Sequence, residues 1–158
     1  MRVTKRTNIA MRVLMYCAAN EGRLVTKSDI AERCNASENH LAQVIHQLAQ
    51  LKVLYTQRGR NGGLSLAHDP ASIAIGDIFR AIEGPVPLAE CFADADDTCP
   101  LVESCRLRGA LTAAAESFYA HLDDITLADL VCNNAGLLDL LTDTKCAKHA
   151  PGAAKETA

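Results

Sequence analysis

The sequence predicts a mainly α-helical fold, with three helices and a β-hairpin in its first half and a long helix in its second half. Apolar residues recur every three or four positions over several segments, and two short β-prone runs flank a glycine-containing stretch. The chain has 158 residues, of which 49% are hydrophobic and 22% charged. This length and composition suit one globular domain with its own core.

Three helices are indicated before residue 52. An apolar stripe at helical spacing predicts a first helix over residues 7–19. Thr26 followed by Asp29 is a capping pattern, so a second helix is predicted over residues 27–34. After a tight turn, we expect Ser37 to cap a third helix. The buried stripe of this third helix is predicted to comprise Leu41, Val44, Ile45, Leu48 and Leu51.

The apolar pattern then changes to that of a β-hairpin. Residues 53–57 and 63–67 are β-prone, and the stretch between them contains glycines suited to positive φ at a hairpin tip. This hairpin would carry Arg58 and Arg60 at its tip. A further helix, ending at Gly84, is defined by Ile75, Ile78, Phe79 and Ile82.

Three helices followed by a hairpin are the elements of a winged helix-turn-helix, and we assign residues 1–84 to this unit. In such a unit one helix enters the DNA major groove, and the hairpin, or wing, lies along the backbone or minor groove. On the third helix, amide side chains can read an adenine edge. The residues expected at this surface are Asn39, His40 and Gln43.

Phosphate contacts are expected from two further groups of residues. Lys27, Ser28 and Ser37, together with the helix N-termini, are suited to hold phosphates and set the register. The wing residues expected to contact phosphate or the minor groove are Arg58, Arg60, Asn61 and Gly62. Glu38 is unfavourable near phosphates unless it reads a cytosine amino group or pairs with an arginine.

Three cysteines lie in a segment, residues 85–106, that lacks helical periodicity. Cys91, Cys99 and Cys105 have C-x7-C-x5-C spacing, and soft thiolates favour an iron–sulfur cluster or zinc over magnesium or calcium. Because both kinds of site usually have four ligands, we expect the fourth from elsewhere. A zinc clip in a constitutive DNA-binding protein and a thiol redox switch are the alternatives.

The remaining cysteines are assigned to other roles. Cys17, Cys34 and Cys132 are expected to be small core residues, and Cys146 to lie in a frayed tail over residues 143–158, with Cys132 and Cys146 as alternatives for the fourth ligand. An enzyme is not expected, because the sequence has no phosphate-binding loop, no nucleophile elbow and no histidine near the cysteine triplet.

Residues 107–142 are assigned to a dimerisation helix and a terminal helix. A narrow, heptad-like apolar stripe is formed by Leu107, Leu111, Ala114, Phe118, Leu122 and Ile125. Since the preceding helices have a core of their own, this stripe is expected to pair with the same helix of a second subunit. Thr126 is predicted to cap the last helix, which runs through Val131.

Charge is divided unevenly along the chain. Residues 1–80 contain 11 Lys+Arg and 6 Asp+Glu, a net charge of +5, whereas residues 81–158 contain 5 and 13, a net charge of −8. A basic first half suits contact with a polyanion. No secretory signal or membrane-spanning run is visible, so we expect a cytoplasmic protein without a membrane partner.

Several of these segments together resemble the iron–sulfur winged-helix regulators that include NsrR, IscR and RirA. The resemblance covers about residues 1–141 and lies in the wing Arg58-Gly59-Arg60-Asn61-Gly62-Gly63, in Thr7-Asn8-Ile9-Ala10-Met11-Arg12-Val13-Leu14-Met15-Tyr16, Ile75-Gly76-Asp77-Ile78, Glu90-Cys91-Phe92, Cys99-Pro100-Leu101, Cys105-Arg106-Leu107 and Thr126-Leu127-Ala128-Asp129-Leu130-Val131. It implies a homodimeric repressor that binds a palindromic operator while its cluster is intact.

The resemblance also implies the ligands and the signal. Cys91, Cys99 and Cys105 would be the thiolate ligands of a [4Fe–4S] cluster, with [2Fe–2S] as an alternative, and nitric oxide would release the protein from DNA in NsrR-like members. Asn8 falls where some NsrR-like members place an aspartate ligand from the partner subunit. The first helix looks closer to iron-responsive RirA-like members, so iron status is the alternative signal.

Overall fold

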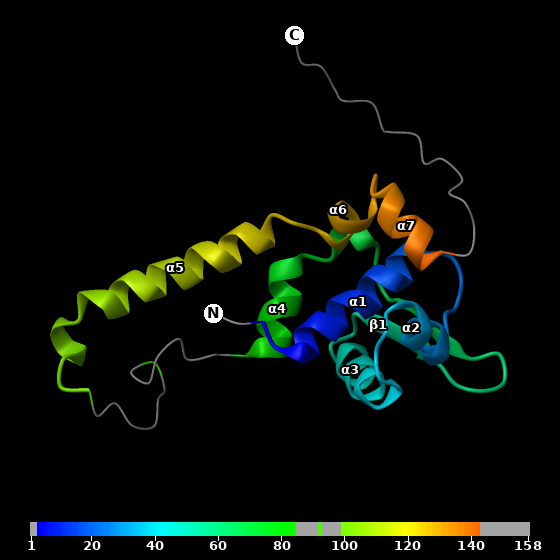
Figure 1. Cartoon of the computed structure of the whole chain (residues 1–158), viewed down its shortest axis with the longest axis horizontal. Helices are drawn as coiled ribbons and strands as arrows, with labels where there is room; N and C mark the ends of the chain where they lie inside the picture. The colour runs from blue at the N-terminus through cyan, green and yellow to red at the C-terminus, as the bar shows by residue number, and fades with distance from the viewer. Residues whose placement is uncertain (1–2, 85–91, 93–98, 143–158) are drawn as a thin grey trace, which may run out of the picture.

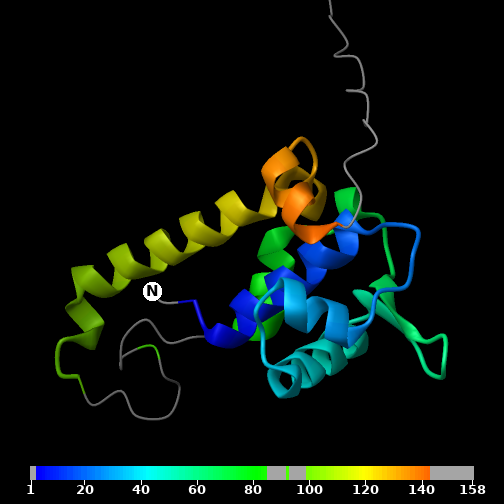
Figure 2. The same cartoon turned by 45° about the vertical axis from the view of Figure 1, so that its right-hand side comes forward.

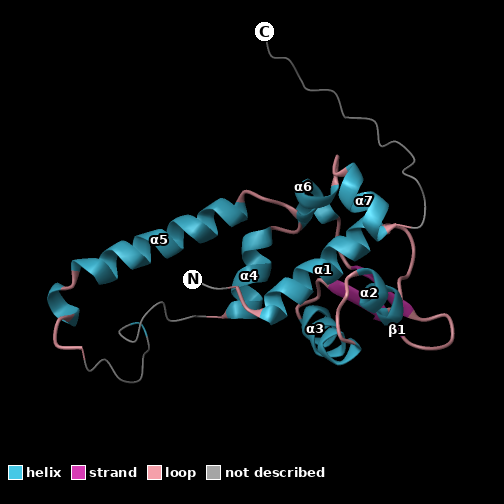
Figure 3. Ribbon diagram, in the orientation of Figure 1, coloured by secondary structure: helices cyan, strands magenta, loops and turns pink. Residues whose placement is uncertain are grey.

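The structure is a computed structural model of the chain, and it describes residues 3–84, 92 and 99–142 (Figure 1). Helices make up most of the described part, together with one two-stranded sheet, which confirms the predicted mainly helical fold (Figure 3). The elements in chain order are α1 (Lys5–Ala19), α2 (Lys27–Arg33), α3 (Glu38–Gln50), β1 (Leu54–Gln57), β2 (Gly63–Leu66), the 3-10 turn η1 (Pro70–Ser72), α4 (Ile75–Glu83), the 3-10 turn η3 (Val102–Ser104), α5 (Arg106–Asp123), α6 (Leu127–Val131) and α7 (Ala135–Leu141).

Helix α1 is the centre of the hydrophobic core. Helix α3 packs on one side of it, and α6 and α7 pack against it elsewhere (Figure 1). Thr4 caps the helix by accepting a hydrogen bond from the Thr7 backbone N–H at 3.3 Å, so α1 begins two residues before the predicted start. Its buried residues are Thr7, Ile9, Ala10, Met11, Val13, Leu14, Tyr16 and Cys17.

Helices α2 and α3 form the predicted helix-turn-helix. The Thr26 hydroxyl accepts a hydrogen bond from the Asp29 backbone N–H, and the Thr26 N–H donates to the Asp29 carboxylate at 2.9 Å, which confirms the predicted capping pair. The bond from the Thr26 N–H is the main reason that the pKa of Asp29 is lowered. At the other end of α2, the Arg12 guanidinium donates to the Cys34 carbonyl at 2.9 Å and ties α2 to α1.

The predicted buried stripe of α3 is one residue too long. Leu41, Val44 and Leu48 are buried, whereas Leu51 is 39% exposed. Helix α3 ends at Gln50, and the chain then turns through Lys52 with a φ of 58°. Because Leu51 lies outside the helix, it does not continue the stripe. Ser37 occupies the predicted cap position, although its side chain makes no capping hydrogen bond.

The predicted hairpin is present, with Leu54 opposite Leu66 and Gln57 opposite Gly63. Gly59 has the predicted positive φ, at 110°, but Gly62 does not. At Gly62 the constraint is close approach, because a Cβ atom there would collide with the Gln57 carbonyl oxygen. Glycine is therefore needed at both positions of the tip for different reasons.

Helix α5 extends away from the body of the molecule and meets α4 near its own C-terminal end (Figures 1 and 2). Arg80 of α4 donates two hydrogen bonds, each of 2.6 Å, to the two carboxylate oxygens of Asp123. A Cβ atom on Gly76 would collide with the same Asp123 side chain, so glycine lets the two helices approach closely here. This junction sets the direction in which α5 leaves the core.

Helix α6 is not the last helix, because α7 follows it. Thr126 caps α6 as predicted, and Asp129 completes the capping box. Helix α7 was not predicted; it has seven residues and contains a glycine. Leu127 and Leu141 are buried in the same core as α1, and the Asn20 side-chain amide donates to the Leu141 carbonyl at 3.0 Å. The C-terminal helices therefore cover the core.

Two of the three cysteines expected in the core are buried there. Cys17 and Cys34 are 3% and 9% exposed, as predicted. Cys132 is exposed, contrary to prediction, because it caps the end of α6 just before a turn in which Asn133 has a φ of 59°.

Two further predictions concern the C-terminal tail and membrane-spanning segments. The predicted tail over residues 143–158, with Cys146, lies outside the described residues. Among the helices of the described part, none has the length and apolarity needed to cross a membrane.

We expect Asn20→Ala to destabilise the protein by about 1–3 kcal/mol, because buried polar groups of α1 and α7 would lose their partner. The measurement is urea unfolding followed by circular dichroism. Asn61→Ala, at an exposed position of the wing, is the control and should leave the midpoint unchanged. Equal midpoints for Asn20→Ala and wild type would contradict this role of Asn20.

Candidate nucleic-acid interface and metal centre

The side chains expected to read bases all lie on the exposed side of α3. Asn39, His40 and Gln43 are exposed, and the stripe formed by Leu41, Val44 and Leu48 faces the core. Asn39 and Gln43 are four residues apart and hence share one face of the helix. His46, three residues further on, is also exposed and extends this face along α3.

At the N-terminal end of this surface, α2 and α3 are joined by an ion pair. The Lys27 ammonium lies 2.9 Å from the Glu38 carboxylate, with the two side chains 41% and 53% exposed. Glu38 thus pairs with a lysine, and not with the arginine considered in the sequence analysis. Ser28 and Ser37, the other residues expected to hold phosphates here, are exposed.

The wing projects from the body of the molecule beyond α2 and α3 (Figure 2). Arg58, Arg60 and Asn61 are exposed at its tip, and Gly62 is half-buried. Backbone hydrogen bonds between Val25 and Leu64, of 2.9 and 2.8 Å, attach the second wing strand to the segment that leads into α2. The position of the wing is therefore fixed relative to the helix-turn-helix.

A helix with exposed amide side chains and an arginine-bearing wing together form a surface that can contact the major groove and the flanking backbone of DNA. The two elements are rigidly connected through the core, since Leu54 and Leu64 of the hairpin belong to the same buried cluster as α3. The exposed side of α3 and the tip of the wing are therefore the candidate surface for contact with DNA.

The structure describes two of the three cysteines of the candidate metal centre. Cys99 is exposed, and Cys105 is half-buried at the position that caps α5. Cys91 lies outside the described residues, and within the described ranges no group of three metal-ligating side chains is found. Phe92, next to Cys91 in the sequence, lies 5.7 Å from the guanidinium of Arg108 in the first turn of α5.

The burial of the described cysteines suits a metal centre formed by Cys99 and Cys105 and not by Cys17 or Cys34. Burial raises the pKa of the Cys17 thiol to about 12 and also raises the pKa of Cys34, so these two thiols stay neutral and are poor ligands. Cys99 is exposed and Cys105 is half-buried in the segment that leads into α5, so both sulfur atoms are accessible to a metal.

Asn8, the candidate for a fourth contact, lies elsewhere in the subunit. It is exposed on α1 and lines a surface hollow with Val3, Thr4 and Lys5. The beginning of α5 is the end of that helix farthest from the core (Figure 1). Within one subunit the structure therefore does not bring Asn8 to Cys99 and Cys105.

The helix that carries Cys105 has no buried residue, and Leu107 near its beginning is 65% exposed. The contacts of α5 with the core lie near its C-terminal end, where Phe118 packs edge-on against Phe79 with ring centroids 6.2 Å apart. Arg80 also lies over the Tyr119 ring at 4.9 Å. The apolar stripe of α5 is thus covered at one end and uncovered at the other.

Two polar contacts of α4, one with the beginning of α1 and one with the end of α5, were not predicted from the sequence. The Glu83 carboxylate at the end of α4 accepts a hydrogen bond from the Thr4 N–H at 2.9 Å. Burial raises the pKa of Glu83, but hydrogen bonds from Thr7 and Thr4 outweigh it, so the net pKa is lowered. Partners 79 positions apart carry no local sequence signal, and neither do Arg80 and Asp123.

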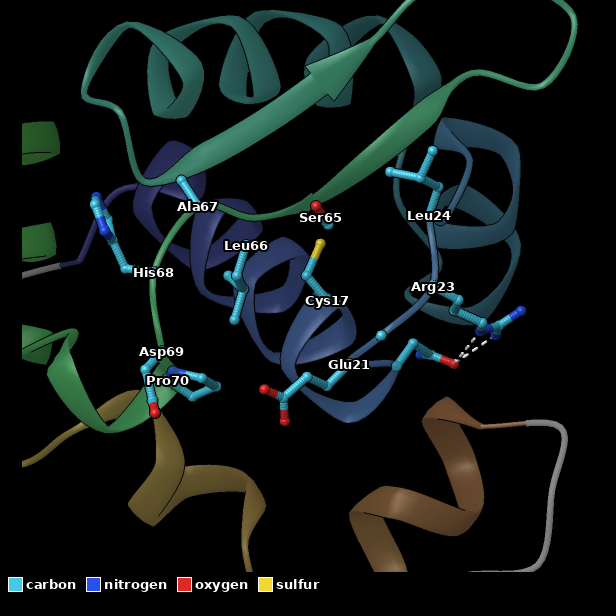
Figure 4. A pocket seen from close by; sticks show the side chains of 12 residues that line it. Cys17, Glu21, Arg23, Leu24, Ser65, Leu66, Ala67, His68, Asp69 and Pro70 are labelled. Atoms are coloured by element: carbon cyan, nitrogen blue, oxygen red, sulfur yellow. Dashed lines mark hydrogen bonds between the residues drawn. The ribbon is translucent and has the colours of Figure 1, made fainter.

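A pocket of about 530 Å³ lies between the C-terminal end of α1 and the segment after β2 (Figure 4). The Cys17 thiol points towards Ser65 in it, and Glu21 lies on the side nearest α6 and α7. In this pocket burial raises the pKa of the Cys17 thiol, and the Asn20 side-chain oxygen accepts hydrogen bonds from the Arg23 guanidinium.

Fold and surface define a winged-helix transcriptional regulator, and comparison with known proteins agrees. Residues 3–133 match the model of the Rrf2 family, described as iron-dependent transcriptional regulators, and the chain belongs to this family. It is a DNA-binding regulator of transcription and not an enzyme, as predicted.

Individual proteins within this comparison are similar to the chain in sequence or in structure. It is 42% identical over 146 residues to the transcriptional regulator NsrR of Geobacillus kaustophilus, an alignment that covers 92% of this chain and 99% of that protein. A transcriptional regulator from Listeria innocua has a similar structure, with a TM-score of 0.68, 26% identity and coverage of 98% and 97%. IscR of T. potens is also similar, with a TM-score of 0.65, 27% identity and coverage of 83% and 86%.

The interface predicts different results for a wing residue and a helix residue. We expect Arg60→Ala to weaken binding to specific and random DNA alike and to reduce the salt dependence of log K by about 0.9, since one phosphate contact is lost. Asn39→Ala should instead alter base preference, at a cost of about 1–3 kcal/mol at one base pair. Fluorescence anisotropy over a range of salt concentrations measures both. Equal losses on both DNAs for the two variants would contradict the assignment.

Proposed function

We propose that this protein is a cytoplasmic, homodimeric repressor that binds a palindromic operator and senses nitric oxide through an iron–sulfur cluster. Each subunit would insert α3 into the major groove and lay the wing along the adjacent backbone. The observation that carries the proposal is the position of Cys99 and Cys105 near the surface at the beginning of α5, while Cys17 and Cys34 are buried as neutral thiols.

Cys91, Cys99 and Cys105 would hold a [4Fe–4S] cluster, and the similarity to NsrR and IscR supports this assignment. The contact between Phe92 and Arg108 supports it too, because it holds the neighbour of Cys91 against the first turn of α5. When bound, such a cluster supplies iron that reacts with nitric oxide and is lost when iron is scarce. Three soft thiolates suit this group.

Dimerisation would occur through α5. The uncovered part of its apolar stripe includes Leu107, which is 65% exposed, and Ala114, which is also exposed, whereas Leu111 between them is half-buried. An apolar seam of this kind is stabilised when a second copy of the same helix covers it. The assignment of residues 1–84, 85–106 and 107–142 to DNA binding, cluster binding and dimerisation remains part of this proposal.

The chain would couple the cysteine segment to DNA through α4 and α5. The segment joins the end of α4 to the beginning of α5, and the two helices are also clamped together by Arg80 and Asp123. A change in the segment would therefore bias the angle between α5 and the winged helix. Half-sites one helical turn, roughly 34 Å, apart tolerate little rotation of one subunit against the other.

The alternative signal is iron status, and Asn8 is the observation that favours it. A neutral amide is a weaker ligand for iron than a carboxylate, so the fourth iron would be held less firmly than where an aspartate is present. Because Asn8 lies away from Cys99 and Cys105 of its own subunit, it would have to act from the partner subunit. A labile cluster of this kind would suit an iron-responsive repressor.

The proposal is tested by Cys99→Ser, with Cys132→Ser as the matched control at an exposed cysteine outside the candidate centre. In anaerobically purified protein, Cys99→Ser should abolish iron–sulfur absorption and weaken operator binding at least about tenfold, a loss of about 1.4 kcal/mol. Cys132→Ser should behave as wild type. Full operator binding by a colourless Cys99→Ser protein would contradict the coupling.

A second experiment separates the possible signals and metals. Iron, acid-labile sulfide and zinc are measured in the anaerobic protein, which is then titrated with nitric oxide or with an iron chelator while operator binding is followed. Release by stoichiometric nitric oxide supports the primary proposal, and release by the chelator alone supports the iron-responsive alternative. Stoichiometric zinc without iron or sulfide would contradict both and favour a zinc clip.

A further inference from the structure

We propose that Glu38 is a specificity-determining residue. In the free protein it pairs with Lys27 and so disfavours binding through the phosphate backbone alone, and on the operator it accepts a hydrogen bond from the N4 amino group of a cytosine. This inference rests on the proposed insertion of α3 into the major groove and identifies one base that α3 reads there.

The geometry places both charges at the DNA-facing end of the helix-turn-helix. Lys27 is the first residue of α2 and Glu38 the first residue of α3, and their charged groups are 2.9 Å apart. Glu38 is followed directly by Asn39, which is exposed on the reading face of α3. The carboxylate therefore lies beside the surface that meets the base edges.

The ion pair lowers the attraction of this surface for any phosphate. While Lys27 is paired with Glu38, its positive charge is partly neutralised and attracts phosphates less strongly. The Glu38 carboxylate is itself repelled by the backbone. With side chains 41% and 53% exposed, the pair contributes little to stability, so it can open at small cost when a better partner is present. The ion pair thus weakens binding to DNA of any sequence, and an operator with the right base can restore the lost affinity.

A cytosine can replace Lys27 as the partner of the Glu38 carboxylate. In the major groove the N4 amino group of cytosine is a hydrogen-bond donor that glutamate can accept, and Lys27 is then released to a phosphate. Without that amino group, the carboxylate is left desolvated against acceptors. The other carboxylate in the first turns of α2 and α3, Asp29, is engaged by Thr26 and is not available for this role.

The test compares Glu38→Gln with wild type in the full-length protein. The control, Glu21→Gln, removes the same charge on the side of the core near α6 and α7 (Figure 4). Each protein selects sites from a randomised duplex library, and its affinity for the selected site and for random-sequence duplex is measured at several salt concentrations. Glutamine pairs with adenine, so Glu38→Gln should replace a selected cytosine by adenine at one position of each half-site.

Glu38→Gln should also bind random duplex about fivefold more tightly, with a salt dependence of log K steeper by about 0.9, because Lys27 is free to contact a phosphate. In a Lys27→Gln background the change in salt dependence should disappear and the gain in affinity should be smaller, because only the repulsion between the Glu38 carboxylate and the backbone is then removed. Glu21→Gln should change neither the selected bases nor the salt dependence.

Two results would overturn the proposal. One is an unchanged base preference in Glu38→Gln with an unchanged ratio of specific to random affinity. The other is a gain on random duplex that is just as large in the Lys27→Gln background. Selection of no sequence at all by the wild-type protein would contradict the proposed operator binding itself and thereby remove the basis for this inference.

Discussion

Burial of α1 on several sides is the constraint on which the rest of the structure depends. Val13 and Leu14 are fully buried, and the same cluster contains residues of α2, α3, the hairpin, α4 and the C-terminal helices. Polar contacts along α1 then orient what packs on it, through Arg12 to the end of α2 and Asn20 to the end of α7. Helix α3 and the wing are consequently rigid with respect to each other, as a surface that contacts DNA requires.

The junction between α4 and α5 depends on that core in turn. Helix α5 buries none of its residues, so its direction is set by a few contacts near its end, chiefly the bidentate pair of Arg80 and Asp123. The hydrogen bonds from Arg80 hold the pKa of the Asp123 carboxyl below its usual value, so the pair stays charged to lower pH than an isolated carboxylate would. A helix attached at one end can transmit a change at its other end as a rotation, and Cys105 lies at that other end.

The candidate site combines predictable and unpredictable parts. Exposure of Asn39 and Gln43 follows from the opposite, apolar stripe of α3, which the sequence displays directly. The pairing of Lys27 with Glu38 does not follow, because it depends on how closely the first residues of two helices approach each other in space. The same holds for Glu83 and Thr4, which are 79 positions apart and meet only because α4 ends beside the beginning of α1.

The helix caps at Thr26 and Thr126 and the glycine-containing wing are predictable from the sequence, because they arise from local rules that act over a few residues. The exposure of Leu51 and Cys132, the formation of α7 and the return of α6 and α7 to the core are visible in the folded chain alone. Those outcomes depend on packing and hydrogen bonds between distant segments, as between Asn20 and Leu141, and no local periodicity encodes them.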